Sequence, residues 1–135
     1  MSDVTTAVPA PRQMRWLTAA QTFALVVGLF LAARAVSTLA AGASFGLPGD
    51  GWRAGFQLVV AGALAFALAR PAWTERIVLG VCLAYVALTV LGDWGSSVLG
   101  VIPVDSRDKL VHPLIAVLAA VALLIPRLRH RTSAG

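Results

Sequence analysis

The chain contains four long apolar runs, each closed by charged residues, with little polar sequence between them. Soluble domains keep about a quarter of their residues charged, whereas this chain has 13% charged and 59% hydrophobic residues and a mean hydropathy of +0.83. A soluble fold would have no polar surface left to cover runs of this size, so we expect the bilayer to surround them. The runs are 17–33, 54–69, 77–91 and 110–125.

Each run is short for a membrane span. A helix of 16 residues covers about 24 Å, against a hydrocarbon core of about 30 Å, so flanking residues must complete the spans. The stretches 35–47 and 92–102 are themselves largely apolar and can do so. The sequence therefore predicts one domain, 16–126, that is an all-α, four-pass transmembrane helical bundle. Its helices are expected near 17–40, 53–70, 75–94 and 109–126.

Successive helices cross the membrane in opposite directions, so the segments between them lie alternately on its two sides. The basic residues are divided unevenly between these two sides. Lys and Arg in excess mark the cytoplasmic side, and tryptophans mark both interfaces. One side holds Arg12, Arg15, Arg70, Arg76, Arg127, Arg129 and Arg131 with Trp16 and Trp73; the other holds Arg34, Arg53, Arg107 and Lys109 with Trp52 and Trp94. We expect a multi-pass protein of the cell inner or plasma membrane with both termini cytoplasmic, as a flexible tail 1–15 and a basic tail 127–135.

A cleaved signal peptide is the alternative for the first run, because basic residues precede it and small residues follow at 40–43. Its apolar stretch is longer than a usual signal core, and Arg34 interrupts the approach to a cleavage site, so we expect a retained helix.

The two halves of the chain echo each other. The segment 26–35 (VVGLFLAARA) aligns with 78–87 (VLGVCLAYVA), and a Pro-x-Asp element recurs at Pro48 and Pro103. The sequence predicts two duplicated helical hairpins with the same orientation, related by an axis along the membrane normal.

Ionisable groups within a membrane are functional-site candidates, because burying them unpaired costs several kcal/mol. Arg34 has two interpretations: it snorkels to the interface as a helix end, or it pairs inside the bundle with Asp93. Gln57 is expected to make an interhelical hydrogen bond rather than to contact a substrate.

The segment 105–113 concentrates the remaining candidates, Asp105, Asp108 and His112. The carboxylates can cap a helix and suit its dipole, which is the expected role. A proton relay through Asp108 and His112, four residues apart on one helix face, is the alternative. A metal or haem site lacks a second histidine near the membrane and the three or four ligands that a transition metal needs, so we expect no metal and no cofactor.

The segment 101–119 (VIPVDSRDKLVHPLIAVLA) resembles the recurring element of a bacterial four-helix integral membrane family that is known only as a domain of unknown function. A Pro-x-Asn/Asp turn there leads into a helix that opens with a histidine, at positions matched here by Pro103, Asp105 and His112. The chain departs from that pattern at Phe56, where the family often has a histidine, and at Ala116, where it has a glycine. The resemblance implies a fold and no chemistry.

Three functions remain open on the sequence. The leading hypothesis is a non-enzymatic packing or accessory subunit of a membrane assembly, or a homo-oligomer, since small residues recur at interface spacing and no catalytic spacing occurs. The expected partners are then the lipid bilayer and either another membrane protein or a second copy of the chain. A nucleic-acid partner is not expected, because the basic residues are scattered among the helix ends and form no basic face. The second is a minimal transporter or channel with Arg34, Gln57 and His112 along a polar path. The third is a membrane enzyme with an Asp/His site at the outer rim.

Overall fold

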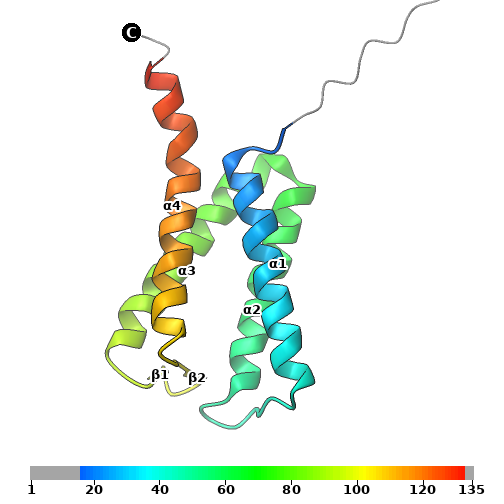
Figure 1. Ribbon diagram of the computed structural model, residues 1–135, viewed down its shortest axis with the longest axis vertical. Helices are drawn as coiled ribbons and strands as arrows, with labels where there is room; N and C mark the ends of the chain where they lie inside the picture. Colours follow the sequence, from blue (N-terminus) through cyan, green and yellow to red (C-terminus); the bar gives the residue numbers. More distant parts are fainter. Residues whose placement is uncertain (1–15, 133–135) are drawn as a thin grey trace, which may run out of the picture.

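A computed structural model describes residues 16–132, and the predicted tail 1–15 lies outside them, as does 133–135. Four long helices form a bundle (Figure 1). They are α1 (Ala19–Ala40), α2 (Asp50–Ala69), α3 (Thr74–Asp93) and α4 (Asp108–Thr132). A one-turn 3-10 helix, η1 (Pro71–Trp73), joins α2 to α3, and two short strands, β1 (Ser97–Val98) and β2 (Ile102–Pro103), lie between α3 and α4.

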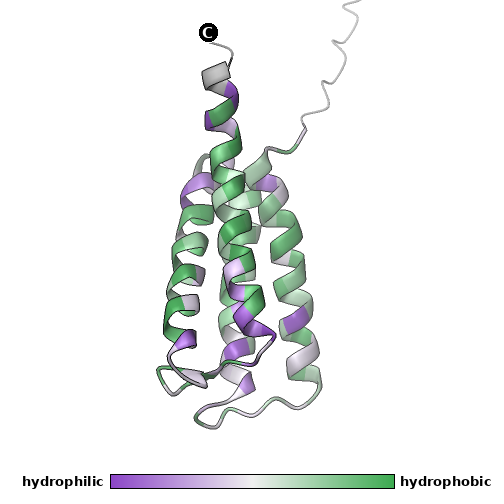
Figure 2. Cartoon of the chain, turned by 60° about the vertical axis from the view of Figure 1, so that its left-hand side comes forward, coloured by the Kyte–Doolittle hydropathy of each residue, from purple (hydrophilic) through white to green (hydrophobic). Residues whose placement is uncertain are grey.

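The all-α four-helix prediction is confirmed, and each described helix is long and apolar enough to cross a membrane. The chain is a multi-pass membrane protein. Figure 2 shows apolar colouring along the helices and hydrophilic colouring mainly toward their ends. All four tryptophans are exposed, Trp16 and Trp73 at one end of the bundle and Trp52 and Trp94 at the other, as an interfacial aromatic belt requires.

Local signals explain most helix boundaries. Thr18 and Gln21 form a capping box at the start of α1, where each side chain bonds the other residue's backbone N–H. Asp50 opens α2 three residues before the predicted start, where a carboxylate favours the helix dipole. At its C-terminal end, α4 continues through Pro126 to Thr132, beyond the expected helix end at residue 126.

We call the end that carries the connections 41–49 and 94–107 the loop end, and the opposite end the terminal end. At the loop end, β1 and β2 pair antiparallel, with Ser97 opposite Pro103. The N–H of Gly49 donates to the carbonyl of Val101 at 3.0 Å and ties the two connections together. At the terminal end, α4 extends beyond the other helices (Figure 1).

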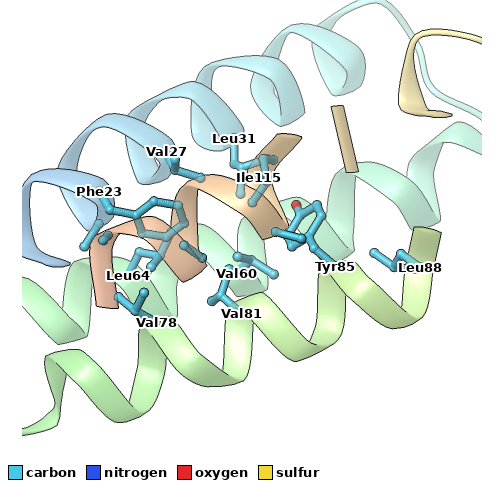
Figure 3. Close-up of a cluster of buried hydrophobic side chains, with 14 of the residues drawn as sticks. Phe23, Val27, Leu31, Val60, Leu64, Val78, Val81, Tyr85, Leu88 and Ile115 are labelled. Atoms are coloured by element: carbon cyan, nitrogen blue, oxygen red, sulfur yellow. The ribbon is translucent and has the colours of Figure 1, made fainter. Parts of the chain in front are cut away.

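The core runs along the bundle axis and contains side chains from all four helices (Figure 3). Toward the terminal end it is mostly apolar, with Leu64 and Val78 fully buried; the buried polar residue there, Thr74, donates its hydroxyl to the carbonyl of Ala67 at 2.8 Å. Gly28 of α1 lies against α2, because a Cβ built there would be 3.4 Å from the Cβ of Leu64, whereas one built at Gly80 would meet nothing within 4 Å. The matched glycines of the two halves thus have different surroundings, and the duplication stays a prediction.

Candidate functional site

The charged residues of the loop end meet in one buried cluster, centred on Asp108 in the first turn of α4. The Asp108 side chain is fully buried. Its Oδ1 accepts a hydrogen bond from Nη2 of Arg34 at 2.5 Å, and its Oδ2 accepts one from Nη1 of Arg53 at 2.8 Å. One carboxylate therefore joins three helices, α1, α2 and α4.

Arg53 extends the cluster to the surface. Besides Asp108, its guanidinium binds Asp105 and Asp50, each at 2.8 Å. The Arg53 side chain is 12% exposed, whereas Asp50 and Asp105 are more than half exposed. We call these five residues (Arg34, Arg53, Asp50, Asp105, Asp108) the ion-pair cluster. Buried charges are tolerated when they are paired and hydrogen-bonded in this way.

The predicted partner of Arg34 was wrong. Arg34 pairs with Asp108, while Asp93 is exposed and makes no ion pair within residues 16–132. The first turn of α4 brings a buried carboxylate to α1, whereas Asp93 is the last, exposed residue of α3. The snorkelling interpretation does not describe Arg34 either, because its guanidinium is held inside the bundle with 23% of the side chain exposed.

The expected capping role also needs correction. The side chains of Asp105 and Asp108 bind arginines of other helices, which the capping role does not describe, while Asp108 does lie in the first turn of α4, where its charge suits the helix dipole. The only local contact of the Asp108 carboxylate among the described residues is a long one, 3.4 Å, from the N–H of Asp105. Arg53 was missed by the sequence reasoning, although its position three residues after Asp50 and four before Gln57 would have indicated an inward face.

A second polar layer lies one helical turn further into the bundle. Gln57 follows Arg53 by one turn on α2, His112 follows Asp108 by one turn on α4, and Tyr85 comes from α3. All three are at least nine-tenths buried. The rings of Tyr85 and His112 pack edge to face with their centroids 5.5 Å apart. The rings of Tyr85 and Phe56 pack at a tilt, with their centroids 6.0 Å apart. Figure 3 shows Tyr85 among the apolar core residues.

Ring packing is the contact that the structure describes for Tyr85 and His112, and the interhelical hydrogen bond expected of Gln57 stays a prediction. Between this layer and Thr74 at the terminal end, the buried side chains are apolar, among them the fully buried Leu64 and Val78.

Three hollows in the described part of the chain are large enough to hold a ligand or a partner, and one of them, of about 420 Å³, lies between α3 and α4 at the terminal end. An open pocket of about 520 Å³ lies at the loop end, beside the cluster, and polar residues Arg34, Ser37, Thr38, Ser44 and Asp50 line it. An apolar groove of about 770 Å³ lies between α1 and α4 at the terminal end. By contrast, the crevice that His112 lines has no room for a water molecule.

Within residues 16–132 there is no group of three or more His, Cys, Asp or Glu side chains that could hold a metal ion. Comparisons of the chain with protein-family models, with curated proteins and with solved structures find no match.

Proposed function

We propose that this protein is a non-enzymatic component of a membrane assembly, and that its groove between α1 and α4 receives a transmembrane helix of another subunit or of a second copy. The observation that carries the proposal is the groove itself. Its volume of about 770 Å³ is comparable to that of established binding sites. It is formed where two helices of the bundle part.

The lining of the groove suits a helix. Most of the lining side chains are apolar, with Thr18, Thr22 and Arg129 as the polar members, and small Ala122 lies among larger neighbours. In lipid, helices associate through van der Waals packing, which a groove with small residues improves. The residues concerned are Phe23, Val26 and Val27 on α1, and Leu118, Val121, Ala122 and Ile125 on α4.

The ion-pair cluster supports this proposal by holding the opposite end of the bundle together. It connects α1 and α4 through Arg34 and Asp108. With the loop end held by ion pairs, a partner helix can enter at the terminal end without separating α1 from α4.

The arrangement gives less support to transport or catalysis. A polar path would have to continue below Gln57 and His112, where fully buried leucine and valine side chains fill the core. An enzyme that uses Asp108 as a base would need substrate to reach its carboxylate, which is fully buried and paired with two arginines.

The same proposal includes an orientation. Arg70, Arg76, Arg127 and Arg129 lie toward the terminal end, and an excess of basic residues marks the cytoplasmic side. We therefore place the terminal end, with the groove, on the cytoplasmic side of the cell membrane.

Cross-linking in native membranes tests the proposal. In a Cys82→Ser background, a cysteine at Val26, which lines the groove and is 60% exposed, carries a benzophenone maleimide. A cysteine at Val59, on the lipid-facing side of α2 and 72% exposed, is the matched control.

We expect an adduct from Val26→Cys and none from Val59→Cys. An adduct of twice the chain mass identifies a second copy as the occupant, and any other defined protein mass identifies a different subunit. Only lipid adducts at Val26→Cys, or equal protein adducts at both positions, contradict the proposal.

A further inference from the structure

We propose that the open pocket at the loop end, between the last turn of α1 and the start of α2, binds a small zwitterion that carries a primary ammonium and a phosphate. This site lies at the opposite end of the molecule from the groove and is independent of the assembly role. Its volume of about 520 Å³ is within the range of about 300–1,000 Å³ for small-molecule sites.

One part of the pocket presents acceptors. The hydroxyl of Ser37 donates to the carbonyl of Ala33 at 2.8 Å, and that of Thr38 donates to the carbonyl of Arg34 at 2.9 Å. Since both protons are used, the two oxygens have only lone pairs left to offer the pocket. The exposed Asp50 carboxylate adds a negative charge, with one oxygen engaged by Arg53.

The helix end reinforces this preference for a cation. α1 has no basic residue in its last turn, so the negative end of its dipole is not balanced from within the helix. A primary ammonium has three N–H donors, which matches two hydroxyl oxygens and a carboxylate.

The other part of the pocket presents donors. Arg34 has five N–H donors in a planar fork, and among the described residues only its Nη2 is engaged, with Asp108. The ion pair keeps the guanidinium in place. The oxygen of Ser44 accepts the N–H of Gly46 at 3.1 Å, so its own proton is available to an anion. A phosphate accepts well from both.

The position of the pocket agrees with a lipid headgroup. Trp52, in the first turn of α2, donates its indole N–H to the carbonyl of Phe45 in the connection 41–49 at 3.1 Å and marks the interface level. The same chemistry occurs in the headgroup of an ethanolamine phospholipid and in free phosphoethanolamine. A choline headgroup lacks the N–H donors, and a purely anionic headgroup places no cation at Asp50.

Native mass spectrometry of the purified full chain in mild detergent tests the proposal. Phosphatidylethanolamine, phosphatidylcholine and phosphatidylglycerol with identical acyl chains are added separately, and free phosphoethanolamine is titrated as a competitor. Asp50→Asn removes the charge of the acceptor side. Ser37→Ala leaves every ion pair of the cluster in place and covers the case in which Asp50→Asn fails to fold. Asp93→Asn is the matched control, a loop-end aspartate outside this pocket.

We expect retention of the ethanolamine lipid over the other two, and about tenfold weaker retention in Asp50→Asn, as for the loss of a hydrogen bond to a charged group. Ser37→Ala should weaken it less, and Asp93→Asn should leave it unchanged. Displacement by free phosphoethanolamine shows that the headgroup alone is recognised, and binding of phosphoethanolamine without the lipid assigns the site to the soluble compound. Equal retention of all three lipids with no phosphoethanolamine bound, or an equal loss in Asp93→Asn, overturns the proposal.

Discussion

Replacement of Asp108 by asparagine removes the buried negative charge that Arg34 and Arg53 share. The substitution keeps the size of the side chain, so the change is electrostatic rather than steric. Arg53 retains Asp50 and Asp105 as partners. Arg34 has no other carboxylate partner within residues 16–132 and becomes an uncompensated, largely buried cation.

The magnitude follows from the contacts. Hydrogen bonds to charged groups contribute about 1.5–3 kcal/mol each, and Asp108 accepts two from guanidinium groups. An asparagine oxygen still accepts one of them, and the second arginine keeps its surface partners. We therefore expect a loss of about 3 kcal/mol in the free energy of unfolding, at the lower end of the 3–5 kcal/mol that breaking a buried ion pair costs.

Unfolding by sodium dodecyl sulfate in mixed micelles, followed by tryptophan fluorescence, measures this loss. Asp93→Asn is the control, and its exposed position predicts a change within about 0.5 kcal/mol. Arg34→Met together with Asp108→Asn removes both members of the pair. The loss of unfolding free energy in this double variant should therefore be at least about 1 kcal/mol smaller than the sum of the losses in the two single variants. An Asp108→Asn variant as stable as Asp93→Asn would refute the electrostatic argument.

Three further substitutions, one of them paired with a control variant, are expected to separate steric, backbone and polar effects, each measured by the same unfolding titration. Gly49→Ala should cost about 1–3 kcal/mol by overpacking, since its Cβ would lie 2.5 Å from the carbonyl oxygen of Ser44, whereas Gly55→Ala, with open space around it, should be neutral or stabilising; equal effects would contradict this. Leu99→Asn should stabilise by about 1 kcal/mol, because the backbone at this exposed position has a φ of 52°, and a loss of stability would show that the strain is absent. Tyr85→Phe keeps the aromatic ring that packs against Phe56 and His112, so it should cost no more than the about 0.5–1.5 kcal/mol of one ordinary hydrogen bond, and a loss above about 3 kcal/mol would contradict this.

The sequence located the helices of this protein because spanning segments are a property of composition and length. A run of apolar residues must form a helix in lipid, where each backbone N–H and C=O has to be bonded internally. The helices predicted near 17–40 and 75–94 therefore match α1 and α3 to within two residues. The short strand pair in 97–103 was not predicted, since two-residue strands carry no periodicity to detect.

The tertiary structure decided which charges meet. Arg34, Asp93 and Asp108 all lie at the loop end on the sequence pattern, and only the rotation of each helix about its axis and the choice of neighbours select Asp108 as the partner. With 3.6 residues per turn, one residue rotates a side chain by about 100°, so an end-of-helix position says nothing about direction. Arg53 likewise belongs to the ion-pair cluster because the orientation of α2 directs its side chain toward Asp108 in the first turn of α4. Composition therefore determined that the chain lies in lipid, and helix packing determined where its few charges are held.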